Sequence, residues 1–174
     1  MNSLIWLALI LLILGMAAVV LARRTRSAAG LPTGQVIYSD TSRWRRAERP
    51  LFSRRHQLAG KPDYLVREGR TIIPVEVKSQ RAPVAGPHKG HILQLAAYCL
   101  LVEETENARP AYGLIHYADQ TVRIDNTPEL TRTLLATLDA MRRDMNRGEA
   151  HRSHDDPARC RRCGVQAACD ERLA

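Results

Sequence analysis

The sequence predicts an α/β domain that follows an apolar N-terminal helix. Three kinds of segment indicate this. Short runs rich in β-branched and aromatic residues indicate strands, because such residues favour extended backbone. Two longer segments place apolar residues at helical spacing, and an uncharged apolar run begins the chain. The strand runs are residues 35–38, 60–66, 71–78, 112–117 and 121–124, and the helical segments are residues 91–104 and 128–147.

The start of the chain predicts a single transmembrane helix. Residues 3–22 carry no charge and are long enough to cross the apolar core of a bilayer. Arg23 and Arg24 follow directly, and the positive-inside rule then places the rest of the chain in the cytoplasm. The alternative is a cleaved signal peptide, but such peptides usually carry their positive charges before the apolar run. We therefore expect a single-pass membrane protein, with residues 1–22 as anchor and residues 23–34 as linker.

The domain is predicted to begin with a strand at residues 35–38, followed by a loop or short helix at residues 39–49. The next two strands are predicted to form a hairpin around a turn at residues 67–70. If the turn is centred on the peptide bond between residues 68 and 69, Asp63 pairs with Pro74.

Asp63, Glu76 and Lys78 then share one face of this hairpin, because side chains alternate along a strand. Glu76 lies diagonally across from Asp63, so that both carboxylates reach one hard cation such as Mg²⁺ or Mn²⁺. Glu76 and Lys78 alternate with apolar residues, and a charge in such a position needs a partner or a metal. A metal-bound water beside Lys78 could attack a phosphodiester. The alternative is an exposed strand edge whose charges only keep it soluble.

The helix predicted at residues 91–104 carries Gln94 and Tyr98 four residues apart, so both lie on one face of it. The amide and the phenol could orient Lys78, the metal-bound water or a phosphate oxygen. In the alternative interpretation, Gln94 is a boundary residue and Tyr98 a core aromatic. The core stripe of the helix consists of Ile92, Leu95, Ala96, Cys99 and Val102.

Two further strands and a long helix complete the predicted domain. Residues 118–120 form the turn between the strands. Thr127 is a predicted N-cap, Pro128 occupies the first helical position and Gly148 ends the helix. Its apolar stripe consists of Leu130, Leu134, Leu138, Met141 and Met145.

The net charge favours an anionic partner. Lys and Arg number 26 against 18 Asp and Glu, which gives a formal charge of +8. Arginine dominates, and its planar guanidinium binds phosphate in bidentate fashion. Residues 43–70 form a basic stretch around Asp63, and we expect it to line a groove for the backbone of DNA. The alternative is attraction to anionic lipid beside the membrane. The candidate nucleic-acid-binding residues are Arg43, Arg45, Arg46, Arg54, Arg55 and Lys61.

The tail, residues 151–174, has ligand-like spacing of cysteines and histidines. Cysteines in a cytosolic chain bind metal more often than they form disulfides. Iron–sulfur clusters usually take four ligands, so three cysteines need one more. His154 or His151 would instead complete a zinc site with the three thiolates. A reduced, metal-free tail is the third possibility. The candidate ligands are Cys160, Cys163, Cys169 and His154, with His151 as the substitute.

Three motifs resemble, in order and spacing, those of the PD-(D/E)XK nuclease superfamily, and within it of the RecB-like group. They are Pro62-Asp63, Glu76-Val77-Lys78 and Gln94-x3-Tyr98. The cysteines of the tail narrow the resemblance to CRISPR-associated exonucleases and their iron–sulfur relatives. The resemblance covers residues 35–172. It implies a restriction-endonuclease-like fold, with a mixed sheet flanked by helices and residues 35–150 as the nuclease core.

The resemblance also implies metal-dependent cleavage of DNA and a role for each motif residue. Asp63 and Glu76 bind Mg²⁺ or Mn²⁺, together with the main-chain carbonyl of Val77. Lys78 helps to activate water. The remaining two residues, Gln94 and Tyr98, support the site.

Two features depart from the family pattern. RecB-like nucleases often add a metal-binding histidine upstream of the motif aspartate, whereas the only histidine before Asp63 is His56, and His91 is the other candidate. The iron–sulfur relatives use a fourth cysteine near the start of the nuclease domain, but the remaining cysteine here, Cys99, lies on the core stripe. We expect a membrane-tethered, metal-dependent DNA nuclease that acts as an exonuclease. The alternatives are an inactive nucleic-acid-binding module on the same fold and a membrane-surface scaffold.

Overall fold

The computed structural model describes residue 6 and residues 10–16, 35–37, 44–148 and 150–173. They belong to two compact units, Met1–Leu135 and Ala136–Ala174. Residues 10–16 are helical, but no helix among the described residues is both long and apolar enough to span a membrane. The predicted anchor lies mostly outside the described residues, and the predicted linker and Arg43 lie entirely outside them.

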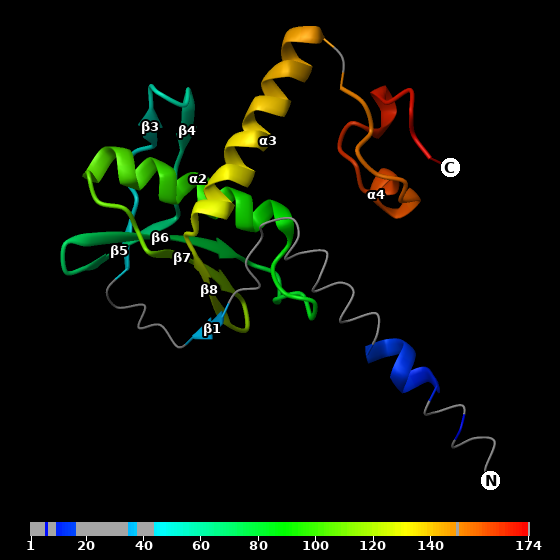
Figure 1. The fold of residues 1–174 in the computed structure, drawn as a ribbon, viewed down its shortest axis with the longest axis horizontal. Coiled ribbons are helices and arrows are strands. Elements are labelled where there is room, and N and C mark those ends of the chain that lie inside the picture. The colour runs from blue at the N-terminus through cyan, green and yellow to red at the C-terminus, as the bar shows by residue number, and fades with distance from the viewer. Residues whose placement is uncertain (1–5, 7–9, 17–34, 38–43, 149, 174) are drawn as a thin grey trace. The chain divides into compact units, whose positions relative to one another are not determined.

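A six-stranded sheet forms the centre of the first unit (Figure 1). Its strands are β1 (Gln35–Ile37), β2 (Trp44–Arg46), β5 (Tyr64–Glu68), β6 (Thr71–Lys78), β7 (Tyr112–Tyr117) and β8 (Thr121–Asp125). They lie in the order β1-β8-β7-β6-β5-β2. β6 and β7 run parallel, and the other neighbouring pairs are antiparallel. The sheet is therefore mixed, as predicted.

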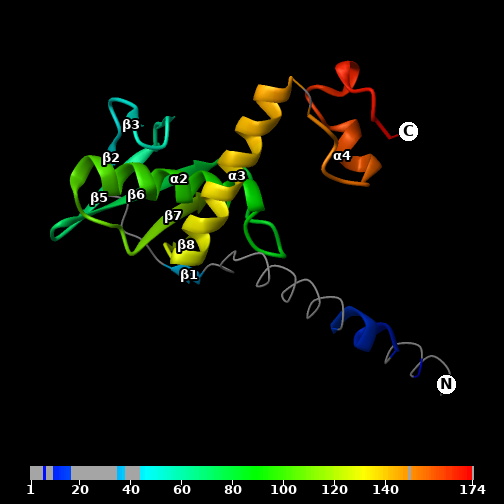
Figure 2. The same cartoon turned by 45° about the horizontal axis from the view of Figure 1, so that its top comes forward.

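Helix α2 (Lys89–Glu106) packs on one face of the sheet and extends beyond the predicted 91–104 at both ends. It contacts β6, β7 and a separate hairpin formed by β3 (Leu51–Ser53) and β4 (Leu58–Gly60) (Figures 1 and 2). Gly113 permits this close packing, since a Cβ there would lie 2.7 Å from Cγ of Leu95. The close contact holds the helix over β6 and β7, where the predicted site residues lie.

Apolar residues fill both faces of the sheet. Toward α2, the five residues of the predicted core stripe are all buried. On the opposite face, Val66, Ile73, Val75 and Leu114 form a cluster, with half-buried aromatic rings packed against it. The central strand β6 is therefore enclosed on both sides, and any polar group on it must be satisfied inside the protein.

The register of the β5–β6 hairpin differs from the prediction. Glu68 pairs with Thr71 and Leu65 with Pro74, so the loop consists of Gly69 and Arg70 alone. Gly69 has φ of 58°, and a two-residue hairpin loop often needs a glycine with positive φ at its first position. The predicted pairing of Asp63 with Pro74 is therefore wrong by two residues. A shift of two keeps every side chain on its predicted face.

The predicted loop or short helix at residues 39–49 is also wrong in part, because residues 44–46 form β2. This edge strand pairs with β5, and the ring of Trp44 packs against that of Tyr64 with centroids 5.6 Å apart. The hairpin of β3 and β4 is not among the elements that the sequence predicts.

Helix α3 (Pro128–Arg147) begins and ends as predicted. The hydroxyl of Thr127 accepts from the N–H of Leu130 at 3.2 Å, and Gly148 ends the helix with φ of 71°. Leu130 and Leu134 are buried, whereas the predicted stripe is exposed further on, at Met141 and Met145. Two short helices follow in the second unit, α4 (Pro157–Arg161) and the 3₁₀ helix η2 (Gln166–Ala168).

Candidate active site

Asp63 stands directly before β5 and is held from two sides. The N–H of Val77 on β6 donates to its Oδ2 at 2.8 Å. The N–H of Ala47, just after β2, donates to its main-chain carbonyl at 3.2 Å. The preceding Pro62 is buried. Although the side chain of Asp63 is exposed, its position is fixed by the end of the central strand.

Glu76 is a buried carboxylate on β6, with 6% of its surface exposed. A carboxylate in such surroundings needs charged or hydrogen-bonding partners. Lys78 donates from Nζ to Glu76 Oε1 at 2.7 Å, and Gln94 donates from Nε2 to the same oxygen at 2.8 Å. The predicted inward charge on this strand is therefore present and has two donors.

Gln94 connects the two strand residues to the helix. Its Oε1 accepts from Lys78 Nζ at 3.0 Å. Its Nε2 donates to Glu76 and also to the hydroxyl of Tyr98 at 2.8 Å. An amide nitrogen has two hydrogens, so both donors of Gln94 are used within this network. Gln94 therefore does more than lie at the boundary of the core, because it links Lys78, Glu76 and Tyr98.

Tyr98 is buried, and its ring lies close to the main chain of β4. A Cβ on Gly60 would approach Cε1 of Tyr98 to 3.0 Å. Burial raises the pKa of the Tyr98 phenol, the negative charges of Glu76 and Asp63 raise it further, and the hydrogen bond from Gln94 opposes them. The hydroxyl therefore stays protonated at neutral pH and can donate as well as accept.

The two candidate histidines occupy different places. His91 Nδ1 lies 3.0 Å from the hydroxyl of Tyr117, the residue paired with Lys78 across β6 and β7. Burial lowers the pKa of His91, and the charges of Lys78 and His88 lower it further. His91 thus lies beside the network, in its neutral form near pH 7.

His56 is directed toward the other end of α2. Its Nε2 lies 3.3 Å from Oε1 of Glu104. Glu104 follows Gln94 by ten residues, which is about 15 Å along a helix axis. The structure therefore does not bring His56 to Asp63 and Glu76.

The donor set at this site suits a hard divalent cation. Asp63 and Glu76 provide carboxylate oxygens and Val77 a main-chain carbonyl, which are the ligand types of Mg²⁺ and Mn²⁺. Asp63 uses only Oδ2 for its hydrogen bond to Val77 among the described residues. The described residues contain no group of three or more His, Cys, Asp and Glu side chains that could hold a metal. An ion held here would therefore complete its shell with waters, as Mg²⁺ commonly does.

Within the described residues of the tail, the candidate ligands do not form a group that could hold a metal. Cys160 is buried and its Sγ accepts from the N–H of Leu173 at 3.4 Å, whereas Cys163 is exposed. His154 Nδ1 accepts from the N–H of Asp156. His151, the alternative to His154 as a ligand, also has a partner, because its Nδ1 lies 2.7 Å from Oε1 of Glu171. Binding of zinc or of an iron–sulfur cluster by the tail stays a prediction. The same holds for Cys169 as its third cysteine ligand.

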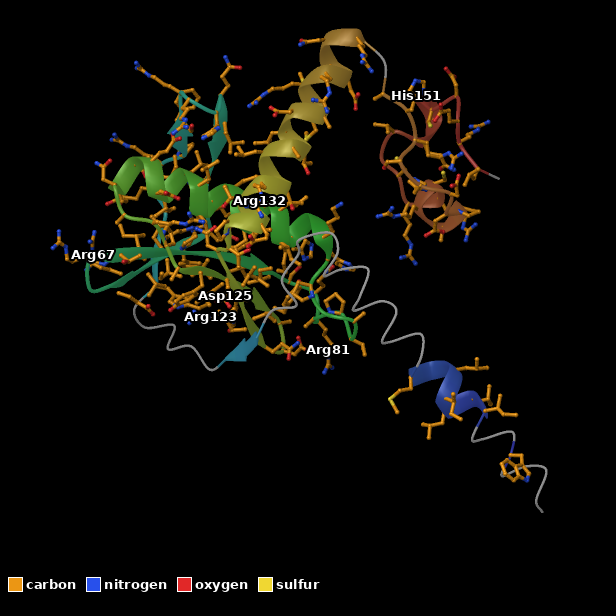
Figure 3. The ribbon with its side chains drawn as sticks, in the orientation of Figure 1. Arg67, Arg81, Arg123, Asp125, Arg132 and His151 are labelled. Carbon is orange, nitrogen blue, oxygen red and sulfur yellow. The ribbon has the colours of Figure 1, made fainter. Side chains whose placement is uncertain are left out.

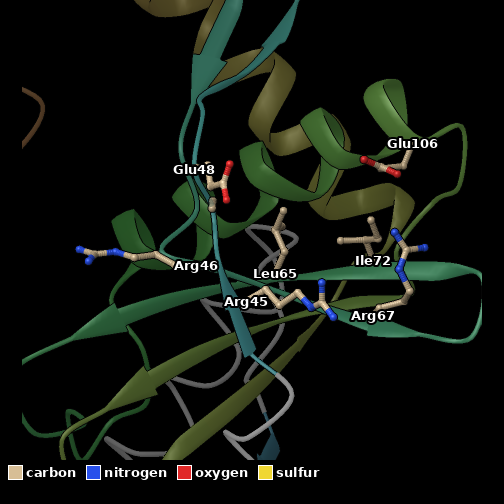
Figure 4. Close-up of a pocket in the computed structure, with 8 residues that line it drawn as sticks. Arg45, Arg46, Glu48, Leu65, Arg67, Ile72 and Glu106 are labelled. Carbon is tan, nitrogen blue, oxygen red and sulfur yellow. The ribbon is translucent and has the colours of Figure 1, made fainter.

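The candidate nucleic-acid-binding residues are spread over several loops and strands of the first unit. Arg54 and Arg55 lie between β3 and β4, and Lys61 precedes Asp63; all three are exposed. Arg45 and Arg46 lie on the edge strand β2. These last two border a pocket of about 760 Å³ (Figure 4). The residues lining it are Arg45, Arg46, Ala47, Glu48, Leu65, Arg67, Ile72 and Glu106.

Arg67 is a pocket residue that belongs to the predicted basic stretch, residues 43–70, but not to the named candidates. It lies near the hairpin end of β5, whereas Arg81 follows the opposite end of β6 (Figure 3). The signal for it was the alternation of strand side chains, since Asp63, Leu65 and Arg67 fall on one face. Glu106 carried no such signal, because only the packing of α2 brings it to the pocket.

Comparison with protein-family models identifies one family. The family model described as PD-(D/E)XK nuclease superfamily matches residues 15–170. The chain is 28% identical over 123 residues to a CRISPR-associated exonuclease Cas4 from Francisella tularensis subsp. novicida (strain U112). That match covers 70% of this chain and 61% of the relative, so the chain spans about three fifths of the relative's length. The chain also matches a crystal structure of SSO0001 at 20% identity, with a TM-score of 0.45, over 67% of this chain and 52% of that one.

Proposed function

This chain belongs to the PD-(D/E)XK nuclease superfamily, and from this premise we propose that it is a divalent-metal-dependent DNA nuclease acting as an exonuclease. One observation carries the proposal. The three motifs, which are far apart in the sequence, meet in one hydrogen-bonded network of Glu76, Lys78, Gln94 and Tyr98, with Asp63 tied to the chain between Glu76 and Lys78. The exonuclease relative supports the mode of cleavage.

The chemistry follows from the positions of these groups. Asp63, Glu76 and the carbonyl of Val77 would hold Mg²⁺ or Mn²⁺. Such an ion lowers the pKa of bound water and offsets negative charge on a phosphate. Lys78 has three donors and uses two of them on Glu76 and Gln94. The third is available to orient the attacking water or to bind a phosphate oxygen as negative charge develops.

Gln94 and Tyr98 are positioning residues in this proposal. Gln94 contacts Glu76 and Lys78, and Tyr98 contacts Gln94, so both would act through the carboxylate and the ammonium group. By occupying Oε1 of Glu76, Gln94 fixes the carboxylate in one orientation. Arginines and lysines of the basic stretch would bind the DNA backbone without reading its sequence.

We also propose that the nuclease domain is tethered to a membrane and lies in the cytoplasm. The support is the uncharged run at residues 3–22, followed at once by Arg23, Arg24 and Arg26. Fractionation of cells expressing the chain tests this. An integral protein stays with the membrane after an alkaline carbonate wash, whereas a peripheral one is released.

The tail is proposed to bind either zinc or an iron–sulfur cluster through Cys160, Cys163 and Cys169, with His154 as the further ligand. The support is the ligand-like spacing alone. Metal analysis and the visible absorption spectrum of protein purified without oxygen separate the two: a cluster absorbs visible light and contains iron, whereas zinc is colourless.

A cleavage assay tests the main proposal. The purified chain is incubated with single- and double-stranded DNA in Mg²⁺, in Mn²⁺ and in EDTA, beside the variants Asp63→Ala and Lys78→Ala. We expect cleavage that needs the metal and is lost in both variants. DNA binding is measured in parallel by fluorescence anisotropy in EDTA.

One outcome favours the inactive binding module. The structure directs His56 to Glu104, and the described part of the chain brings no third metal-ligating side chain to Asp63 and Glu76. If the folded protein binds DNA but no metal restores cleavage, it is a binding module on a nuclease fold. If it ignores DNA and binds anionic vesicles, it is a membrane-surface scaffold.

A further inference from the structure

The pocket beside β2 is adjacent to the candidate active site. Ala47 lines the pocket, and its N–H donates to the carbonyl of Asp63. Leu65 and Arg67 follow Asp63 at alternate positions, so they lie on the same face of the sheet as the carboxylates. Arg45 pairs with Leu65 across β2 and β5 and shares this face. The pocket thus begins next to Asp63 and leads away from it along β5.

The length of this path corresponds to a short piece of one DNA strand. Leu65 is two residues from Asp63 and Arg67 is four, or about 7 and 13 Å along a strand. Neighbouring phosphates on one strand of a duplex are about 3.4 Å apart along its axis. The separation of neighbouring phosphates through space is longer than this axial rise, so a phosphate in the pocket would lie one or a few nucleotides from the one at the carboxylates.

The arginines of the pocket are available for a phosphate. Arg45, Arg46 and Arg67 make no ion pair among the described residues, although two glutamates line the same pocket. Arg45 and Arg67 extend from the neighbouring strands β2 and β5 beside Leu65 (Figure 4). Two guanidinium groups over an apolar floor of Leu65 and Ile72 suit a phosphate with two or more free oxygens.

One acidic residue indicates that the strand ends in this pocket. Glu106 lines it and is the last residue of α2, where the negative end of the helix dipole adds to its charge. Glu48 also lines the pocket, but it follows Ala47 and lies at the Asp63 end. A polyanion that continued past Arg67 would meet the carboxylate of Glu106 and be repelled. A strand that stops at the arginines avoids this repulsion.

We propose that this pocket binds the terminal phosphate of the strand being cut. The enzyme would then cleave at a fixed distance from the end of that strand. The inference rests on the proposed nuclease function. It predicts that the enzyme prefers ends that carry a phosphate, and that it releases short products of uniform length, one or a few nucleotides each. The strand polarity is left to the experiment, which tests 5′ and 3′ phosphates separately.

The experiment compares single-stranded oligonucleotides with a phosphate or a hydroxyl at one end, labelled at the other. Wild type is compared with Arg45→Gln and Arg67→Gln, and with Arg70→Gln as a matched control. Arg70 is an exposed arginine of the same hairpin that does not line the pocket. We expect one phosphorylated end to be cut about tenfold faster, since its extra charge forms charge-assisted hydrogen bonds in the pocket. This preference should fall toward one in both pocket variants and persist in the control.

Binding measured without cleavage separates the possible failures. Fluorescence anisotropy in EDTA should show tighter binding of the phosphorylated oligonucleotide, and both pocket variants should abolish the difference. Equal cleavage and binding of both ends by wild type would overturn the inference and leave the nuclease intact. If the pocket variants weaken both oligonucleotides equally, the pocket holds an internal phosphate, and the end-measuring proposal is wrong. Absence of cleavage overturns the nuclease function, and the anisotropy result then decides the pocket by itself.

Discussion

The main-chain N–H of Val77 donates to the carboxylate of Asp63 over 2.8 Å, which ties the residue before β5 to the end of β6. Val77 lies between Glu76 and Lys78 on the central strand. One hydrogen bond therefore sets the position of the first motif relative to the second. The geometry of the candidate site depends on the pairing of these two strands, not on the conformation of a loop.

This bond separates two effects of changing Asp63. Asp63→Asn keeps an oxygen that accepts from Val77 but removes the negative charge, so we expect cleavage to fall about 100-fold or more. The free energy of unfolding should change little, while Asp63→Ala should lower it by about 0.5–1.5 kcal/mol. Asp125→Asn is the control, because Asp125 pairs with Arg123 on an exposed part of β8 (Figure 3). Full activity in Asp63→Asn would remove this residue from the site.

Gln94→Glu tests the amide that joins Lys78 to Glu76. The new carboxylate still accepts from Lys78, but it donates to neither Glu76 nor Tyr98 and places a second negative charge beside Glu76. We expect kcat to fall about 10- to 100-fold, as for other residues that orient ligands, with a smaller change in KM. Steady-state kinetics measure both. A rise in KM alone would mean that Gln94 contacts the substrate.

Tyr98→Phe should lower stability without changing the pH dependence of cleavage. The pKa of this phenol is raised by burial and by Glu76, so the phenol stays protonated throughout the pH range of the assay. Loss of the hydroxyl leaves one N–H of the Gln94 amide without its acceptor, which costs about 1–3 kcal/mol. Chemical denaturation measures the loss. A change in the shape of the pH profile between pH 6 and 9 would show that Tyr98 ionises during the reaction.

His91 makes stability depend on pH in a defined direction. Its pKa in the folded protein is lowered from the ordinary 6.5, chiefly by burial. Between the two values the unfolded chain binds more protons, so the free energy of unfolding falls as pH drops below 6.5 and stops falling below the folded pKa. Urea unfolding at a series of pH values should show this slope, and His91→Gln should reduce it. An unchanged slope in the variant would assign the effect to other groups.

Cysteine reactivity follows burial. Burial raises the pKa of the Cys99 thiol to about 12, and the thiolate is the reactive form. Cys163 is exposed. Mass spectrometry after brief treatment with iodoacetamide should find Cys163 modified in the native protein and Cys99 only after unfolding. Protection of Cys163 that a chelator removes would support metal binding by the tail. Equal modification of both residues would contradict the packing of α2.

The sequence was sufficient to place Asp63, Glu76 and Lys78 on one face, even though the predicted register was wrong. A strand side chain changes face only when the pairing register shifts by an odd number of residues. The predicted register was wrong by two residues, so each side chain stayed on its predicted face. The hairpin loop was placed one residue early because both Glu68-Gly69 and Gly69-Arg70 fit a turn, and only the positive φ of Gly69 decides between them.

Features made by distant residues could not be predicted in this way. Trp44 is the only apolar residue among neighbouring arginines, so nothing local marks β2 as a strand; its pairing with β5 does. The pocket joins residues of β2, β5, β6 and the end of α2. Likewise, His56 appeared as a candidate ligand by its distance along the chain, whereas the hairpin of β3 and β4 carries it to Glu104.

The burial of Glu76 has a consequence for engineering this protein. Replacing a buried ion pair by well-packed apolar residues is often neutral or stabilising, and Glu76 with Lys78 is such a pair on the central strand. A screen that selects random variants for heat resistance alone would thus enrich apolar residues at these two positions. The selected variants would be more stable but would no longer cleave DNA. A selection for stability must therefore measure cleavage activity on the same variants.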